Sequence, residues 1–284
     1  GCGPTPMLYF ASYHLGATAA MMVTGSHNPP EYNGLKMVVG NKALMAEEVK
    51  IIGEMAQDHD FRTETGAHQE DLDLAHTYAD TLLKDFKTYY PPTFQRIAWD
   101  AGNGATGRLI EELVKRLPGE HILLNTEIDG RFPNHHPDPT IEKNMRQLQD
   151  VVRANQCDYG IGFDGDGDRL GIVDDLGRML CADQIMMLFA QEILEQHPGA
   201  TIIGDVKTSN HFFEKVTALG GIPLMWWTGH SHIKKKMREV KSPLAGEMSG
   251  HIFFADSYFG FDDGLYAALR FIGIMAQRCE RLST

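Results

Sequence analysis

Short apolar runs alternate with helical patterns along the chain. Runs typical of strands lie at residues 18–23, 35–39, 96–100, 121–124, 159–163, 170–173, 201–205, 222–226 and 243–247. Apolar residues at helical spacing predict helices at residues 7–15, 46–57, 72–86, 105–117, 141–154 and 230–240, and others near Asp183, after Ser209 and from Asp262. Strands that alternate with helices indicate an α/β fold of successive mixed-sheet domains, in which the sheets are largely parallel.

The elements fall into three blocks, and we predict domains at residues 1–88, 89–179 and 180–284. The first break is predicted at residues 89–92, because neither Pro91 nor Pro92 can continue a helix. The chain opens with turn residues that lead straight into a helix, with no strand before it. It also stops soon after its last helix. We therefore expect a piece of a longer protein with an incomplete first domain.

Composition and charge exclude some classes of partner. The hydrophobic content of 43% is that of an ordinary globular protein, and no apolar run approaches the ~20 residues that span a bilayer. The net charge of -12 argues against nucleic acid or an anionic membrane as a partner, although a cleft with concentrated cations can still bind a small anion. Cys2, Cys157, Cys181 and Cys279 show no paired spacing, which favours a reducing compartment, the cytoplasm.

An acidic loop at residues 164–169 separates two predicted strands. Its sequence, Asp-Gly-Asp-Gly-Asp-Arg, allows Asp164, Asp166 and Asp168 to converge on one hard divalent cation, because glycine lets the backbone fold tightly. An EF-hand fails, because Arg169 stands where that motif needs glycine and Asp175 where it needs glutamate. An acidic turn without a metal stays open. Acids followed at once by an arginine favour a metal held beside a phosphate.

Two other loops carry polar side chains after predicted strands. Residues 24–30 place Ser26 on a glycine-hinged turn, where it can act as a nucleophile or a phosphate carrier with His27 as a hydrogen-bonding neighbour. In residues 246–251, Glu247 and Ser249 stand two apart, so an extended backbone points both to one side, where they can bind adjacent sugar hydroxyls. A plain turn explains the first loop equally well, and a solvated hairpin turn is the alternative for the second.

Three further patterns favour structural roles. Residues 102–107 match the dinucleotide fingerprint, but Asn125 stands where the next strand should end in an acid, which favours a turn for close helix packing. His135 and His136 would point different ways in an extended loop, which favours a structural or domain-interface role over a metal site. Residues 234–236, three lysines on a helical pattern, favour a solvated helix face.

Together the three loops closely resemble those of the α-D-phosphohexomutases, and within that family the phosphomannomutase/phosphoglucomutase branch. The family carries T-G-S-H-N-P, D-G-D-G-D-R and G-E-x-S-G in this order in successive domains, and all three are complete here at residues 24–29, 164–169 and 246–250. The resemblance extends from residue 1 to about residue 274, and residues 132–137 and 228–231 are similar to further landmarks. It implies the phosphohexomutase fold, with three domains represented.

The resemblance also implies a function: reversible phosphoryl transfer between the 1- and 6-positions of mannose or glucose phosphate, through a phosphoserine and a bisphosphorylated sugar. Ser26 would carry the phosphoryl group and Arg169 would hold it. Mg²⁺ would be bound by the phosphorylated Ser26 together with Asp164, Asp166 and Asp168. The other implied site residues are Lys36 and His251 as acid/base candidates, Lys207 and His230 beside the substrate, and Glu247 and Ser249 at its 3- and 4-hydroxyls.

Two departures from the family pattern lower the activity that we expect. The family has a strand and an arginine-bearing loop ahead of residue 1, and a fourth domain whose R-x-S-x-T-x-P-like loop clamps the non-reacting phosphate; this sequence contains neither. We therefore expect weak or absent mutase turnover. Alternatives are a phosphoglucosamine mutase, which Met248 disfavours, and a non-catalytic phosphosugar-binding fragment. A metal-dependent phosphatase would need a second metal, of which one acidic cluster gives no sign.

Overall fold

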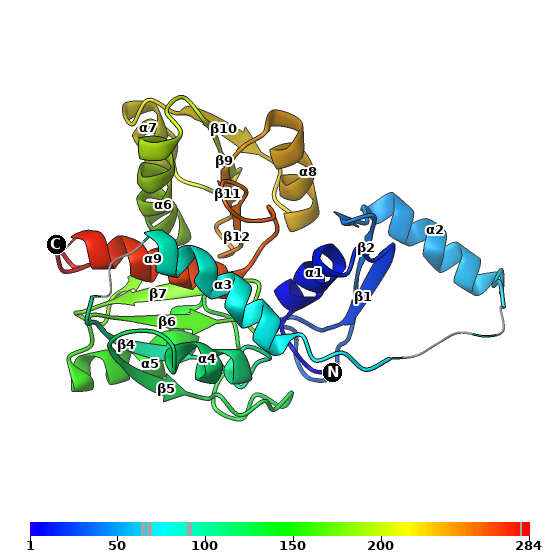
Figure 1. The fold of residues 1–284 in the computed structure, drawn as a ribbon, viewed down its shortest axis with the longest axis horizontal. Coiled ribbons are helices and arrows are strands. Elements are labelled where there is room, and N and C mark those ends of the chain that lie inside the picture. Colours follow the sequence, from blue (N-terminus) through cyan, green and yellow to red (C-terminus); the bar gives the residue numbers. More distant parts are fainter. Residues whose placement is uncertain (64–65, 67–69, 90–92, 279) are drawn as a thin grey trace.

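Three β-sheets, one for each predicted block, organise the molecule (Figure 1). The structure is a computed structural model that describes residues 1–63, 66, 70–89, 93–278 and 280–284. Residues 90–92, where the first domain break is predicted, and Cys279 lie outside the described residues. The predicted domain boundaries therefore stay predictions, while the sheets can be described one by one.

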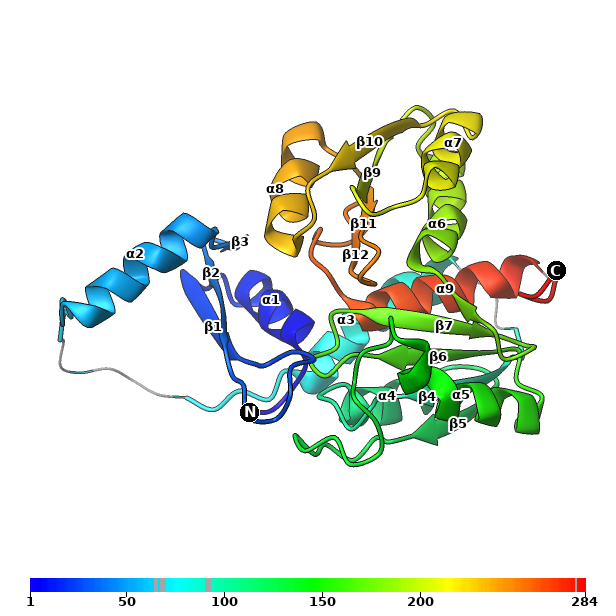
Figure 2. The same ribbon diagram turned by 180° about the vertical axis from the view of Figure 1, so that it is seen from behind.

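The first block is an antiparallel sheet covered by one helix. Its elements are α1 (Thr5–His14), β1 (Ala19–Val23), β2 (Leu35–Val39), β3 (Lys42–Ala43) and α2 (Ala46–Gln57). The strand order is β1-β2-β3, and α1 packs against β1 and β2. By contrast, α2 has no buried residue and projects from the body in both ribbon views (Figures 1 and 2). The loop that carries Ser26 connects β1 to β2.

The second block holds the acidic loop at the tip of a buried hairpin. The helix α3 (Ala75–Tyr89), which falls in the predicted first block, packs against α4 and α9. The elements of the second block are β4 (Arg96–Asp100), α4 (Gly107–Val114), β5 (Glu120–Leu124), α5 (Glu142–Asn155), β6 (Tyr159–Phe163), β7 (Leu170–Asp174) and β8 (Met179–Leu180). The strand order is β5-β4-β6-β7-β8. Because Phe163 pairs with Leu170 across the antiparallel β6 and β7, residues 164–169 form the connection between two fully buried strands.

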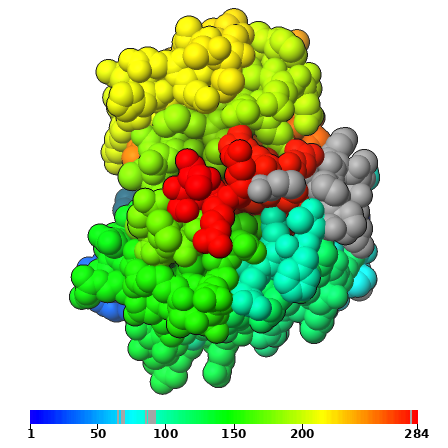
Figure 3. All heavy atoms as spheres, turned by 90° about the vertical axis from the view of Figure 1, so that its left-hand side faces the viewer, coloured from blue at the N-terminus to red at the C-terminus, as the bar shows by residue number. Residues whose placement is uncertain are grey.

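The third block contributes the loop at residues 246–251 and the last helix. Its elements are α6 (Ala182–Gln196), β9 (Thr201–Asp205), α7 (Asn210–Ala218), β10 (Ile222–Trp226), α8 (His230–Val240), β11 (Leu244–Gly246), β12 (Ile252–Phe254) and α9 (Gly264–Arg278). The strand order is β10-β9-β11-β12. The helix α9 is buried from Gly264 to Ala276 and packs against α3, α6 and β7, so it joins the second and third blocks (Figure 3).

The expectation of largely parallel sheets is wrong. The described strands of the first sheet pair only antiparallel, and the other two sheets combine parallel pairs with antiparallel ones. Tight connections such as the one between β6 and β7 produce these antiparallel pairs, because parallel neighbours need a longer crossover. Three strands of two or three residues, β3, β8 and β12, were not predicted. In the described residues, no helix is long and apolar enough to cross a membrane.

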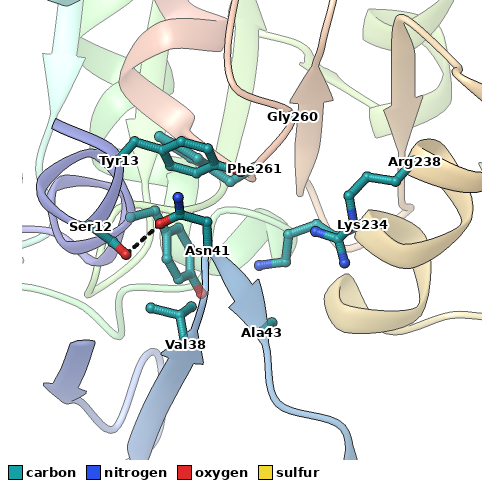
Figure 4. A pocket seen from close by; sticks show the side chains of 10 residues that line it. Ser12, Tyr13, Val38, Asn41, Ala43, Lys234, Arg238, Gly260 and Phe261 are labelled. Atoms are coloured by element: carbon teal, nitrogen blue, oxygen red, sulfur yellow. Dashed lines mark hydrogen bonds between the residues drawn. The ribbon is translucent and has the colours of Figure 1, made fainter. Parts of the chain in front are cut away.

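The first and third blocks meet where α1 and the β2–β3 turn face α8 (Figure 4). Ser12 Oγ donates a hydrogen bond to Asn41 Oδ1 at 2.6 Å, which ties α1 to the turn. The ring centroids of Tyr13 and Phe261 are 6.1 Å apart, and Lys234 Nζ lies 4.3 Å from the centroid of the Tyr9 ring. These contacts place the β1–β2 hairpin relative to α8 and the loop before α9.

The fingerprint-like segment 102–107 is a close-packed turn. A Cβ on Gly104 would lie 2.7 Å from the carbonyl oxygen of Gly165, and one on Gly107 would lie 1.9 Å from the carbonyl oxygen of Thr126. Ala105 N donates to the Gly165 carbonyl at 2.9 Å. The packing interpretation is thus confirmed, since Gly104 lets the turn approach the acidic loop and Gly107 lets α4 approach the backbone of Thr126 after β5.

Replacing Gly107 with alanine should destabilise the chain, because the new methyl group collides with backbone. We expect Gly107→Ala to lower the free energy of unfolding by about 1–3 kcal/mol, measured by urea denaturation. The matched control is Gly53→Ala in α2, where a Cβ meets nothing within 4 Å. A Gly107→Ala chain as stable as the Gly53→Ala chain would contradict the packing role.

Candidate active site

The acidic loop is bonded through its backbone to all three blocks. Thr5 N, at the start of α1, donates to the Asp166 carbonyl at 2.8 Å, and Gly264 N, at the start of α9, donates to the Gly167 carbonyl at 3.1 Å. Leu170 N donates to the Gly250 carbonyl at 3.2 Å. The loops that carry Ser26 and His251 therefore lie against the same six residues, although the sequence separates them widely.

The three carboxylates of the loop form a group that can hold a metal ion. Asp164, Asp166 and Asp168 are buried, and each offers an oxygen within 4.8 Å of the others. Among the described residues, Asp166 Oδ1 has no hydrogen-bond partner, while Asp168 Oδ1 lies 3.3 Å from His251 Nε2. Lys36 Nζ donates to Asp166 Oδ2 at 2.7 Å and to Asp168 Oδ2 at 2.5 Å, so an ammonium group already lies where positive charge is favoured. An all-oxygen donor set of this kind suits a hard divalent cation.

A second group of potential ligands, Asp168, His251 and Asp262, shares one carboxylate with the first. Burial opposes a charge on His251, but Asp168 and Glu247 outweigh it and raise the pKa of the imidazole to about 10. The acidic loop offers only oxygen donors, which a hard divalent cation prefers, so it is the better site of the two for such an ion.

The serine loop is held in a strained conformation against the acidic loop. Ser26 has a φ of 52°, in the left-handed region that few residues other than glycine adopt. Ser26 N donates to Thr24 Oγ1 at 2.8 Å, and Ser26 Oγ donates to Asp164 Oδ2 at 3.1 Å. A Cβ on Gly165 would lie 2.3 Å from the Ser26 carbonyl oxygen, so glycine is needed there for the two loops to meet. The serine hydroxyl thus lies directly beside the candidate metal ligands.

Two basic groups border the serine. Ser26 Oγ lies 3.2 Å from His27 Nδ1, and burial together with the charge of Arg169 lowers the pKa of His27, so this imidazole is neutral at neutral pH. Arg169 Nε donates to Asp164 Oδ2 at 3.0 Å, the same oxygen that accepts from Ser26. Its Nη2 is buried and has no hydrogen-bond partner in the described part of the chain. A free guanidinium donor beside a serine hydroxyl suits an anionic group bound there.

The loop at residues 246–251 and the start of α8 bring one histidine each to the acidic loop, His251 and His230. His251 Nε2 lies 3.3 Å from Asp168 Oδ1, and its Nδ1 lies 2.8 Å from Ser249 Oγ. Glu247 accepts a short hydrogen bond from Gly229 N. The ring of His230 stacks on that of His251, with centroids 5.9 Å apart. Burial and the charge of Lys234 lower the pKa of His230 to about 4, so at neutral pH His230 is neutral while His251 is charged.

Ten of the eleven predicted site residues fall into this connected arrangement. The remaining one, Lys207, is exposed on the loop after β9. The predicted solvated face is wrong for Lys234, which is buried and pairs with Asp262 at 2.7 Å because α8 turns this side toward the loop before α9. Sequence reasoning also missed Asp138, which lies 3.5 Å from Arg169 Nη1; its only signal was the proline-rich segment around it.

Comparisons with known proteins agree along the whole chain. Family models described as phosphoglucomutase/phosphomannomutase, alpha/beta/alpha domains I, II and III match residues 1–63, 76–177 and 182–284. The chain is 42% identical over 277 residues to a phosphomannomutase/phosphoglucomutase of Pseudomonas aeruginosa, covering 98% of this chain and 59% of that protein. It is 40% identical to a phosphoglucomutase of Neisseria meningitidis, covering 97% and 60%.

A solved structure of a phosphoglucomutase/phosphomannomutase family protein from Burkholderia thailandensis superposes with a TM-score of 0.93 at 42% identity, covering 99% of this chain and 62% of that one. The chain therefore spans about six tenths of the length of the curated relatives that it matches.

A divalent cation should bind the acidic loop and stabilise the fold. With Mn²⁺ as a paramagnetic probe at about 100 times its Kd, we expect the free energy of unfolding to rise by about 2.7 kcal/mol. Asp168→Asn should remove most of this gain, because it withdraws a charged ligand. Asp129→Asn, at a half-buried carboxylate paired with the exposed Arg131, is the control and should keep it. If Mn²⁺ stabilised Asp168→Asn and Asp129→Asn equally, the ion would bind somewhere other than the acidic loop.

The stability of the metal-free chain should depend on pH through His251. Its pKa is raised from 6.5 to about 10, so its charged form stabilises the fold fully below about 6.5, and this contribution is lost as the pH rises toward 10. We expect urea denaturation in a chelator to show falling stability from pH of about 7 to about 10. His251→Gln should flatten the curve in this window, and an unchanged slope would refute the assignment.

Proposed function

Since this chain belongs to the phosphoglucomutase/phosphomannomutase family, we propose that it carries out reversible phosphoryl transfer between the 1- and 6-positions of a mannose or glucose phosphate. The observation that carries the proposal is the hydrogen bond from Ser26 Oγ to Asp164 beside the unpartnered Nη2 of Arg169. Phosphoryl transfer depends mainly on positioning and on neutralising charge, and this arrangement offers both.

In the proposed reaction, Ser26 carries the phosphoryl group and gives it to a sugar hydroxyl. The bond between phosphorus and Ser26 Oγ breaks while a bond from phosphorus to the sugar oxygen forms. The hydroxyl proton must pass to a base, and we propose His230 for this task because it is neutral at neutral pH and its ring stacks on that of His251. The oxygen that leaves phosphorus needs a proton in turn. His251 and Lys36 suit this donation, since the pKa of each is raised and both carry a proton.

Mg²⁺ is the cation that we propose for the acidic loop. Its hard oxygen donors Asp164, Asp166 and Asp168, with an unpartnered oxygen on Asp166, fit the preference of this ion. A phosphate oxygen on Ser26 would complete the set. When bound, the ion would supply positive charge to the transferring group. Arg169 would hold that group from its other side through Nη2.

Glu247 and Ser249 are proposed to bind the 3- and 4-hydroxyls of the sugar, with Lys207 and His230 beside the substrate. Hydroxyls near the middle of the ring can be bound in either orientation of the sugar. The sugar can therefore turn over between the two half-reactions, so that its 1- and 6-positions are presented in turn to the same phosphoserine. The bisphosphorylated sugar is then the intermediate. For the compartment, we propose the reducing cytoplasm, which fits the free thiols of Cys2, Cys157 and Cys181.

The first test is the transfer of a phosphoryl group onto the chain. We expect incubation with glucose 1,6-bisphosphate and Mg²⁺ to add one phosphoryl group, which intact mass spectrometry detects and peptide fragmentation maps to Ser26. Ser26→Ala should take none, whereas Ser257→Ala, at an exposed serine of the loop before α9, should take one as the wild type does. A label that persists in Ser26→Ala would refute the phosphoserine role.

A second measurement separates the alternatives. Conversion of mannose, glucose and glucosamine 1-phosphates to their 6-phosphates should be compared with the same phosphorylated chain. Faster conversion of mannose or glucose phosphate supports the proposal, and a preference for glucosamine phosphate favours that mutase instead. Binding of glucose 1-phosphate without any labelling of Ser26 would identify a non-catalytic phosphosugar-binding protein.

A further inference from the structure

We propose that Asp138 is a positioning residue for Arg169, which it holds so that Nη2 faces the phosphoryl group on Ser26. The inference rests on the proposed function, because it assigns Arg169 to the transferring group. It concerns the proline-rich segment of residues 132–139, which lies between β5 and α5 and which no step above uses.

The guanidinium of Arg169 is held at two of its three nitrogens. Nε donates to Asp164 Oδ2 at 3.0 Å, and Nη1 lies 3.5 Å from Asp138 Oδ1. Because the group is planar, two anchors fix its rotation as well as its position. The third nitrogen, Nη2, is buried and is left as a donor without a partner among the described residues. Without Asp138, only Asp164 would hold the side chain, and Nη2 could turn away from Ser26.

Asp138 is itself fixed by contacts that do not involve Arg169. Its Oδ1 accepts from Thr140 Oγ1 at 2.7 Å and from Thr140 N at 3.0 Å, and its carbonyl accepts from Asn144 Nδ2 at 3.0 Å. These bonds attach it to the start of α5. Burial opposes its ionisation, but the hydrogen bonds from Thr140 and the charge of Arg169 outweigh it and lower its pKa. A fixed, ionised carboxylate is what a positioning role requires.

The rest of the segment is attached to the turn after β4. Asn134 Nδ2 donates to Asn103 Oδ1 at 2.8 Å, and His135 Nε2 lies 2.9 Å from Asp100 Oδ2. His135 Nδ1 lies 3.0 Å from the carbonyl of His136, so both ring nitrogens are engaged. The structural role predicted for His135 is confirmed, since its side chain attaches the segment that ends at Asp138 to the end of β4, while the role predicted for His136 stays a prediction.

Replacing Asp138 with asparagine tests the role, because it keeps the shape and the contact with Thr140 but removes the charge. With the chain labelled from glucose 1,6-bisphosphate, we expect Asp138→Asn to slow phosphoryl transfer to glucose 1-phosphate about tenfold. KM should change less than about twofold and Mn²⁺ affinity should not change, since Asp138 touches neither sugar nor metal. Asp129→Asn, which removes the pair between a half-buried carboxylate and the exposed Arg131, is the matched control and should transfer at the wild-type rate.

A double-mutant cycle separates positioning from a general loss of structure. In an Arg169→Ala background, Asp138→Asn should slow transfer less than about twofold, because the group that it positions is gone. The same tenfold loss in both backgrounds would overturn the proposal, and so would wild-type transfer by Asp138→Asn while Arg169→Ala is impaired.

Affinity for inorganic phosphate gives a readout that does not depend on turnover. Calorimetry should show weaker binding to Asp138→Asn and to Arg169→Ala than to the wild type. If the wild-type chain took no phosphoryl group but still bound inorganic phosphate more tightly than Asp138→Asn and Arg169→Ala, the proposed function would be refuted and the positioning role supported. Unchanged phosphate affinity in Asp138→Asn, in a chain whose Ser26 is labelled normally, would refute the positioning role alone.

Discussion

Buried negative charge in the acidic loop is the constraint on which the rest of the structure depends. Three carboxylates are costly to bury unless cations and hydrogen-bond donors surround them. The donors come from each block: Lys36 and Thr5 from the first, Arg169 from the second and His251 from the third. The first turns of α1 and α9 add backbone amides to the loop carbonyls. The blocks meet at this loop because each supplies part of what makes its burial tolerable.

The sequence predicted well what depends on local pattern. The strands β4, β6, β9 and β10 and the helices α2 and α8 have the predicted bounds, because each has a clear period and clear flanking residues. Strand direction was misjudged, since an alternation of elements does not reveal which neighbours are joined by hairpins. The strands β3, β8 and β12 are too short to carry a pattern of their own and exist only through pairing with a neighbour.

Some residues of the candidate site could be predicted from local sequence motifs, and others could not. Ser26, Asp164 and Glu247 lie in motifs whose glycines mark them in the sequence, so they could be found before the structure. Asp138, Asp262 and Lys234 could not, because their importance comes from partners far away in the chain: 31 residues separate Asp138 from Arg169, and 28 separate Lys234 from Asp262. A lysine on a helical pattern looks solvated until the fold places a carboxylate opposite it.

The β1–β2 hairpin carries both Ser26 and Lys36, and this has a thermodynamic consequence. The ammonium of Lys36 and any ion on the acidic loop are drawn to the same carboxylate oxygens. If the hairpin moved away, the acidic loop would lose the Lys36 ammonium and attract a metal ion more strongly. If a metal ion bound those oxygens, the hairpin would lose its ion pairs with the loop. Metal binding to the loop and contact between the loop and the hairpin are therefore linked, and each changes the equilibrium constant of the other by the same factor. The strength of the contact between the hairpin and the acidic loop therefore depends on how far an ion would replace Lys36 at these oxygens.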